Sequence, residues 1–405
     1  MKRILLSVFA VAITAAWAVP ASAADVTFGG QYRVRGEYRD NQDFNDNADD
    51  SISSATQRVR LTAKANATDD TSVKITLQDT RLWGQNTGVL TDSGGATAEN
   101  NTLDLHEAYV NVNNLFGTSV SVRAGRQELN YGDQRLIGAF GWSNNGRAFD
   151  GVKLNYSNDM VNVDAFNMTI TADTSTATDD DTTLSGVYLT VPKAVPNNTV
   201  DLYVINKRDN TAMSLYTFGA RVKGAFNAID YTAEAAFQSG DQSSTVSYDA
   251  SAFAVKAGYT LPTPMKIRIG AEYDFATGDD GTTTTDNEAF QILYPTDHGH
   301  FGIADVAGVN HWTNLQAWSL NAKANVNEQL SVYAAYWDFT EEETSVAANG
   351  DDLGNEVDLV ATYKYNKAVN VQAGYAIFSP DTAKSGAGNP DDSENFAYLM
   401  LTANF

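Results

Sequence analysis

Arginines recur at every second position in two stretches near the N-terminus of this 405-residue chain. They are Arg33 and Arg35 in the first stretch, and Arg58 and Arg60 in the second. Side chains two residues apart on a β-strand point to the same face, so each pair would project from one face of a sheet. Rings of arginine and lysine make pores select anions and phosphate-like solutes. We therefore predict an anion-binding surface here.

These bases have a second interpretation, because they could instead pair with carboxylates and brace the wall of a sheet. That interpretation is weaker for the four arginines, which outnumber the neighbouring Glu37. The same alternation places further bases on the polar face of other segments. These additional candidates are Arg123, Arg221, Lys223 and Arg268.

Residues that would support catalysis or metal binding are few. The chain has no cysteine, which excludes disulfides, thiol nucleophiles, cysteine-ligated zinc and c-type haem attachment. The run Asp297-His298-Gly299-His300 has metal-ligand residue types, but no third and fourth ligand accompany it. His106 could act as a base, yet no serine pattern near it marks a nucleophile, and no GxSxG, HExxH or P-loop occurs. We predict no enzyme activity, no cofactor and no metal site.

Composition narrows the class of protein. The formal net charge is −23, from 27 basic and 50 acidic residues, which argues against a nucleic-acid-binding protein. The mean hydropathy of −0.31 excludes a bundle of apolar membrane helices. It leaves a membrane β-barrel open, because half of each strand in such a barrel faces water.

The first residues have the order of a signal peptide. Lys2 and Arg3 precede an apolar stretch over 4–19, and Ala21-Ser22-Ala23 fits a cleavage site. We predict a signal peptide over 1–23 and an outer-membrane β-barrel over 24–405; the alternative for the first segment is an N-terminal core helix.

The rest of the chain has period two rather than a helical period. From Val26 to Arg39, for example, an apolar face alternates with a charged face. The pattern predicts an all-β protein, a transmembrane antiparallel up-and-down barrel of 18 strands, with 16 as the next choice. The expected strands are 26–39, 56–67, 71–83, 103–112, 119–127, 150–157, 159–170, 183–191, 199–207, 212–226, 229–238, 250–260, 265–276, 313–325, 328–339, 354–365, 368–378 and 394–405.

Long connectors alternate with short ones along the chain, as in 40–55 followed by 68–70; only 208–211 breaks the rhythm. Outer-membrane barrels have short periplasmic turns and long external loops, whereas a soluble β-sandwich, the alternative fold, has no reason to keep this order. The long loops hold most of the acids and are expected to be a solvated outer face, with Ca²⁺ or lipopolysaccharide-bridging cations as an alternative. The chain ends in an amphipathic strand closed by Phe405, similar to the assembly signal of bacterial outer-membrane barrels.

One stretch carries a family resemblance. The run from Gly125 to Gly138, GRQELNYGDQRLIG, and the run from Trp142 to Val152, WSNNGRAFDGV, resemble a signature of the alginate-export family of outer-membrane porins. Blocks at 78–84, 104–109 and 293–298 are similar to further family motifs. The signature positions are Gly125, Gln127, Glu128, Tyr131, Gly132, Asp133, Trp142 and Asp150.

The resemblance implies an 18-stranded monomeric barrel with an arginine-rich constriction, which in alginate producers exports that polyuronate. It also implies that Arg126, Arg135 and Arg147, which match the signature by position, belong to the constriction. Alternation by itself places Arg126 on the face opposite Arg123, so a bulge would be needed to turn it inward.

Two classes of function follow for a protein of the bacterial outer membrane. The first is a porin or exporter whose basic lumen passes anionic solutes or an alginate-like polysaccharide. The second is a barrel that houses or docks a partner protein for electron transfer or export, with a surface adhesin or lipid hydrolase as a third, weaker class. Expected partners are outer-membrane lipid and lipopolysaccharide, anionic solutes or polyuronate, and the barrel-assembly machinery acting on Phe405; we expect no nucleic acid and a monomer.

Overall fold

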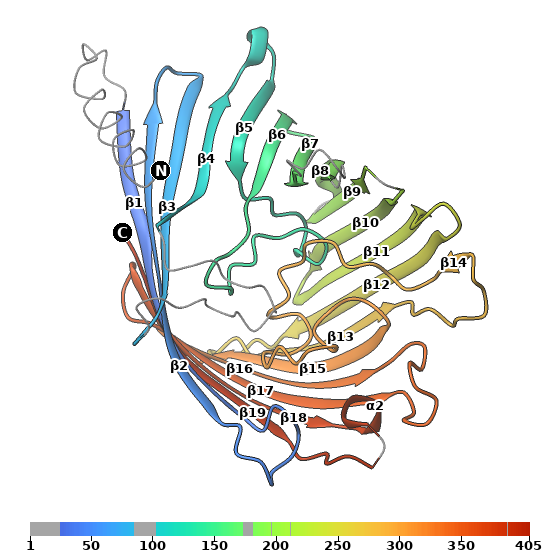
Figure 1. Ribbon diagram of the computed structural model, residues 1–405. Coiled ribbons are helices and arrows are strands. Elements are labelled where there is room, and N and C mark those ends of the chain that lie inside the picture. The colour runs from blue at the N-terminus through green and yellow to red at the C-terminus, as the bar shows by residue number, and fades with distance from the viewer. Residues whose placement is uncertain (1–24, 85–102, 173–180, 196, 211, 387) are drawn as a thin grey trace.

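A closed antiparallel β-barrel forms the body of the protein (Figure 1). The computed structural model describes residues 25–84, 103–172, 181–195, 197–210, 212–386 and 388–405, so the predicted signal peptide lies outside the described residues. The sheet has 19 strands, of which the two-residue β14 is a short addition; the other 18 strands form the barrel. No helix in these described ranges is long and apolar enough to cross a membrane.

The strands follow one another around the barrel in chain order, apart from β14. Their bounds are β1 Asp25–Asp40, β2 Ile52–Asn66, β3 Thr71–Leu82, β4 Asp104–Val112, β5 Val120–Gln127, β6 Phe149–Ser157, β7 Asn162–Thr171, β8 Thr182–Val195, β9 Asn198–Asp209, β10 Ser214–Phe226, β11 Ile229–Asp241, β12 Ser247–Thr260, β13 Arg268–Ala276, β14 Asp286–Asn287, β15 Leu315–Asn325, β16 Leu330–Thr340, β17 Asp352–Lys364, β18 Val369–Pro380 and β19 Glu394–Asn404. Two short helices, η1 (Leu115–Gly117) and α2 (Thr382–Ser385), lie in connectors.

The predicted barrel of 18 strands is confirmed, and every expected strand is present. The largest differences lie at strand ends: β2 begins at Ile52 rather than 56, and β8 ends at Val195 rather than 191. Alternation fades at these ends because the chain there leaves the apolar part of the membrane, so side chains no longer need to sort by face.

The barrel closes where the first strand meets the last. Strands β1 and β19 pair over residues 31–40 of β1, with Val34 opposite Leu401. At the end of this seam, Gly30 donates its N–H to the Phe405 carbonyl oxygen at 2.8 Å, and Phe405 donates back to Gly30 at 3.1 Å. A Cβ on Gly30 would lie 2.4 Å from the Arg60 carbonyl oxygen and 2.7 Å from the Phe405 ring. The seam therefore requires glycine at this position.

We expect Gly30→Val to destabilise the closed barrel by roughly 1–3 kcal/mol, the usual cost of overpacking. The measurement is the folded fraction on semi-native gels across a urea series after refolding in detergent. Gly36→Ala on the same strand is the control, because its Cβ would meet nothing closer than 3.9 Å. Equal unfolding midpoints for the two variants would contradict the assignment.

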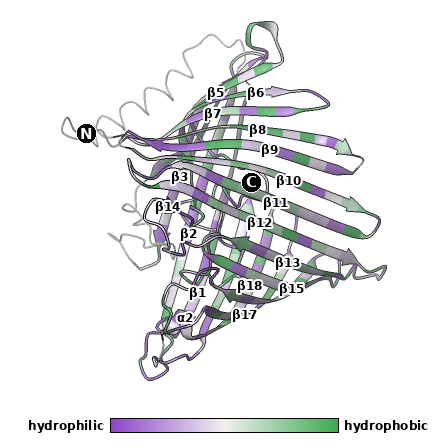
Figure 2. Cartoon of the chain, turned by 90° about the vertical axis from the view of Figure 1, so that its right-hand side faces the viewer, coloured by the Kyte–Doolittle hydropathy of each residue, from purple (hydrophilic) through white to green (hydrophobic). Residues whose placement is uncertain are grey.

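Many apolar side chains of the strands lie on the outer face, and many charged ones lie on the inner face, the reverse of a soluble protein. Leu61, Leu320 and Leu399 are 50%, 58% and 60% exposed, whereas Arg35 and Asp274 are 1% and 0% exposed. Figure 2 shows the underlying alternation as purple and green bands along strands such as β9 and β10. An outer face of this kind is stable only where lipid covers it, so the other face lines the lumen.

Two connectors fold into the lumen instead of extending from the barrel (Figure 1). We call residues 128–148, between β5 and β6, the first inward segment, and residues 288–314, between β14 and β15, the second inward segment. They are joined by backbone hydrogen bonds: Tyr294 N–H donates to the Leu136 carbonyl oxygen, and Gly138 N–H donates to that of Tyr294, both at 2.8 Å. Apolar residues of both segments form a core inside the barrel with the wall: Leu129, Ile137, Phe290, Val309, Phe339 and Phe378.

Candidate pore constriction

Three arginines of β1 and β2, namely Arg33, Arg35 and Arg58, bind the backbone of the first inward segment. Arg33 donates to the carbonyl oxygens of Gly141 at 2.8 Å and Ser143 at 3.0 Å. Arg58, which lies directly opposite Arg33 in the β1–β2 register, donates to the same two oxygens at 3.1 and 2.8 Å. Like charges placed opposite each other repel, and these shared carbonyl oxygens offset that cost without cancelling the charge.

Arg35 completes this contact through the next residue of the segment. It donates to the Trp142 carbonyl oxygen at 2.7 Å, and its guanidinium lies 3.8 Å from the centre of the Trp142 ring. The other side of that indole stacks on His298 of the second inward segment at 3.6 Å. The side chain of Trp142 thus links the arginine wall to both inward segments.

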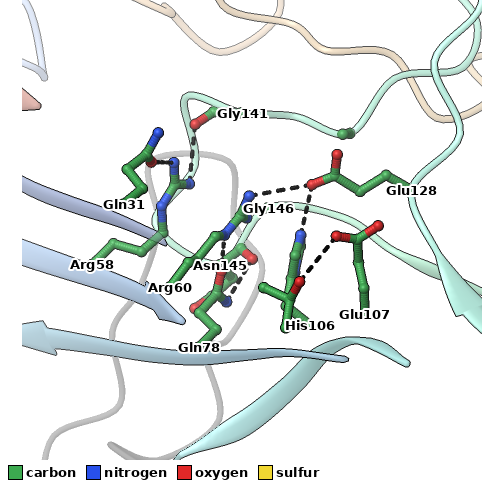
Figure 3. A network of polar contacts seen from close by, with 12 residues as sticks. Gln31, Arg58, Arg60, Gln78, His106, Glu107, Glu128, Gly141, Asn145 and Gly146 are labelled. Atoms are coloured by element: carbon green, nitrogen blue, oxygen red, sulfur yellow. Dashed lines mark hydrogen bonds and ion pairs between the residues drawn. The ribbon is translucent and has the colours of Figure 1, made fainter. Parts of the chain in front are cut away.

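Arg60 belongs to a separate ionic network at the start of the first inward segment (Figure 3). Its Nη1 lies 3.2 Å from Glu128 Oε1, and His106 Nε2 lies 2.7 Å from the same oxygen. Burial alone would raise the pKa of Glu128, but the contacts with His106 and Arg60 outweigh it and hold that pKa below its usual value. Glu128 therefore stays a carboxylate and anchors the point where the chain turns inward.

The opposite wall, formed by β10, β12 and β13, binds the first inward segment through ion pairs in which it supplies both acids and bases. Arg135 of the first segment forms ion pairs with Glu272 and Asp274 of β13, the latter at 2.8 Å. Asp133, two residues earlier, pairs with Arg221 of β10 and with Lys256 of β12 at 2.7 Å. Burial would raise the pKa of Asp133, but Lys256 and Arg221 outweigh it and lower that pKa. The acid Asp133 of the segment thus meets bases of the wall, and the base Arg135 meets acids of the wall.

The three histidines of the second inward segment have internal partners. His298 Nδ1 lies 2.8 Å from Asp305 Oδ2, and His300 Nε2 donates to the Asp133 carbonyl oxygen at 2.8 Å. His311 Nδ1 lies 3.3 Å from Asp297 Oδ1. The run that has metal-ligand residue types in the sequence thus serves to join the two segments.

The remaining predicted bases differ in their surroundings. Arg268 binds Asp230 with two hydrogen bonds, at 2.8 and 2.6 Å. Arg147 joins the inward segments by donating to the Pro295 carbonyl oxygen at 2.6 Å. Arg123 and Lys223 line polar cavities on the lumenal face.

Arg126 is a correction, because the structure places it on the outer face. It pairs in register with Asp150, and their side chains form an ion pair of 2.7 Å, 38% and 57% exposed. Asp150 shares its face with Val152, which points toward lipid. Gly125 has a φ of 124°, but this local distortion does not turn the next side chain inward.

Other signature positions have structural roles. A Cβ on Gly125 would lie 2.3 Å from the Ala108 carbonyl oxygen. Gln127 is fully buried and donates to the Gly125 carbonyl oxygen at 3.2 Å. Tyr131 donates to Asp164 at 3.0 Å and stacks on Tyr188. Gly132, with a φ of 57°, fits closely against the Arg221 side chain.

Sequence reasoning did not foresee the role of Glu356 on β17. Its Oε1 accepts the backbone N–H groups of Ile303 and Ala304 at 2.7 and 2.9 Å, and it is fully buried. Alternation placed Glu356 on the polar face, but its partners are backbone groups, which no residue type in the sequence marks.

Comparison with known proteins identifies the family of this chain and solved structures with a similar fold. The family described as "Alginate export" matches residues 24–394. Among solved structures, Pseudomonas aeruginosa OccK9 (OpdG) superposes with a TM-score of 0.66 at 14% identity, covering 94% of this chain and 98% of that one. Pseudomonas aeruginosa OprD superposes with a TM-score of 0.65 at 13% identity, covering 94% of each chain. No curated protein matches the sequence. The match over nearly the whole chain and the 18-stranded barrel together show that the protein belongs to the alginate-export family of outer-membrane β-barrel porins.

Proposed function

We propose that this barrel is a channel for anionic solutes, with the arginine wall of β1 and β2 as its selective element. One observation carries the proposal: four arginines converge on the first inward segment, where Arg35 pairs with Glu37 and Arg60 pairs with Glu128, both at 3.2 Å. Arg33 and Arg58 donate to neutral backbone carbonyl oxygens of that segment, so positive charge gathers along this wall. In a lumen walled by low-dielectric material, such a field concentrates anions.

The first test is single-channel conductance of the mature chain in a planar bilayer, with the reversal potential measured under a KCl gradient. We expect open steps and a preference for chloride over potassium. A cation preference would mean that the acidic loops control selectivity. A silent but folded barrel would favour the second function, a barrel that acts through a partner protein.

A substitution tests the arginine wall directly. Replacing Arg33 and Arg58 by Gln removes two basic side chains. We expect the chloride-to-potassium permeability ratio to fall about sevenfold, because losing one kT of local potential lowers the local chloride concentration and raises that of potassium, each about threefold. Arg126→Gln is the matched control, since its side chain lies on the outer face and should leave the ratio unchanged. Equal ratios in all three proteins would show that the arginines only brace the wall.

The finer properties belong to the same proposal. Polyuronates are the first large anions to test as blockers, because their repeated carboxylates match a basic lumen. We propose that the protein acts as a monomer in contact with lipopolysaccharide, and that the assembly machinery recognises the strand ending in Phe405. Support for the last point comes from the position of Phe405 at the seam that closes the barrel.

A further inference from the structure

The outer face of strands β5 to β11 is built in layers, which follow from the register of the strands. Short turns mark the periplasmic end of outer-membrane barrels, so the end with the long connectors is the external rim. The layer at this rim is polar, and its members lie opposite one another from strand to strand: Arg126, Asp150, Thr169, Thr183, Arg208 and Ser214. This rim layer therefore borders the headgroups of the outer leaflet.

Polarity falls step by step from the rim toward the middle of the membrane. The second layer mixes polar and apolar side chains: Val152, Asn167, Ser185, Asn206 and Tyr216. The third layer is apolar throughout: Leu154, Ala165, Val187, Val204, Phe218 and Phe237. A membrane lipid has the same order of charged headgroup, polar linkage and acyl chain, so the three layers suit a lipid that lies along this face.

Two hollows lie in the apolar part of the same face. One has a volume of about 500 Å³ and includes Ala165 in its lining, and the other, of about 460 Å³, includes Ala220 and Ala235. They share Val187 and Val204, so they adjoin each other. Small alanine side chains stand here beside larger apolar ones, which leaves room on the surface of the barrel. The hollows face lipid, and acyl chains are the groups that can enter them.

The two arginines of the rim layer supply positive charge for a headgroup. Arg208 is exposed. The Arg126 side chain is 38% exposed, and its Nη1 forms the ion pair with Asp150. A guanidinium has five N–H donors, so Arg126 can bind a phosphate through its other nitrogens while it keeps this pair. Both arginines stand above the hollows, on the strands that line them or on the strand beside them.

Farther round the barrel the charge of the outer face reverses. Near the external rim, β11, β12 and β16 carry Asp241, Asp249 and Asp338. Arg81 on β3 is a further outer-face arginine near the rim, but it pairs with Asp79 at 2.7 Å and lines neither hollow. Among the described residues, rim arginines and hollows therefore coincide on the side formed by β5 to β11.

We propose that the outer face of β5 to β11 is a binding site for lipopolysaccharide. The ligand is its membrane-embedded part, lipid A, which is a phosphorylated sugar with several acyl chains. Arg126 and Arg208 bind phosphate, the polar groups of the second layer meet the hydroxyl and amide groups of the sugar, and acyl chains enter the two hollows. The proposal rests on the lipopolysaccharide contact proposed above and gives it a defined place on the barrel.

The first test is titration of the folded barrel in detergent with lipid A, dephosphorylated lipid A and phosphatidylglycerol, read by native mass spectrometry. We expect lipid A to bind at least about tenfold more tightly than its dephosphorylated form, because a hydrogen bond to a charged group contributes a tenfold change in affinity or more. Equal binding of these two would overturn the role of the arginines. Equal binding of lipid A and phosphatidylglycerol would reveal a general site for anionic lipids and overturn lipopolysaccharide as the ligand.

Variants of the rim locate the phosphate contacts. Arg126→Gln with Arg208→Gln should weaken lipid A binding at least about tenfold. Asp150→Asn should strengthen it, because the carboxylate that competes for Arg126 is removed. Arg81→Gln is the matched control, since Arg81 is a rim arginine away from the hollows. Unchanged binding in the double variant, or an equal loss in Arg81→Gln, would refute the site.

A second set of variants tests the hollows. Ala165→Leu with Ala220→Leu fills them, so we expect weaker binding of lipid A, while the barrel should stay folded because both side chains face lipid. Ala334→Leu on the outer face of β16 is the control. Unchanged binding in the filled variant would overturn the hollows as acyl-chain sites. These titrations do not require conduction, so a silent or cation-selective channel would overturn the channel function without deciding this result.

Discussion

Replacing Arg135 by Met is expected to release the inward segments and to raise the single-channel conductance. The Arg135 side chain is 3% exposed and lies between Glu272 and Asp274, which are 13% and 0% exposed. Its guanidinium also lies 5.6 Å from the Phe301 ring and 5.5 Å from that of Trp312, both on the second inward segment. Removing it leaves two buried carboxylates without their counter-charge, and breaking a buried ion pair in this way costs about 3–5 kcal/mol.

The measurement combines conductance with proteolysis of the inward segments in the folded barrel. We expect larger, noisier open steps and faster cleavage within residues 128–148. A triple variant that also carries Glu272→Gln and Asp274→Asn is the control. Because it removes the unpaired charges, it should recover most of the protection, as neutral replacements of buried ion pairs usually do. If the Arg135→Met variant has the conductance and the protease resistance of the wild-type protein, other contacts are enough to hold the inward segments in place.

Acidification is expected to loosen the same packing through His300. Burial and the positive charges of Arg135 and Lys256 together lower the pKa of His300 to about 3. When the segments are released, the pKa returns to about 6.5. His300 binds a proton more weakly when the segments are packed than when they are released. Packing therefore has its full stability above about pH 6.5, the pKa of the released state, and becomes less stable as the pH falls below that value. The loss is up to about 1.4 kcal/mol per pH unit, or roughly 3 kcal/mol at pH 4.

The measurement is current noise and segment proteolysis between pH 7.5 and pH 4. His300→Gln keeps a donor for the Asp133 carbonyl oxygen but does not titrate, so we expect a flatter response in that variant. His311→Gln is the matched control, since His311 is 34% exposed and its variant should keep the wild-type acid response. An identical response in His300→Gln and the native protein would exclude this histidine as the cause.

The barrel could be predicted from the sequence because its cause is local. Successive side chains of a strand face lipid and lumen in turn, and the polarity of each residue indicates which of the two it faces. Val34 and Arg35 on β1 are an example. The alternation also placed Arg126 opposite Arg123, and the structure agrees with it rather than with the position in the family signature. The order of long and short connectors needed no knowledge of contacts either.

Only the tertiary structure decided what the charged residues touch. Arg33, Arg35 and Arg58 bind carbonyl oxygens of residues 141–143, about a hundred positions away, and every residue type carries the same carbonyl group. The pairing of the two inward segments joins Gly138 to Tyr294, and Glu356 binds the backbone of Ile303. Alternation fixes the face of a side chain but not its distant partner, because that depends on how connectors fold back across the lumen. The sequence therefore determined the barrel and its polar lumen, and the fold of the connectors determined the constriction.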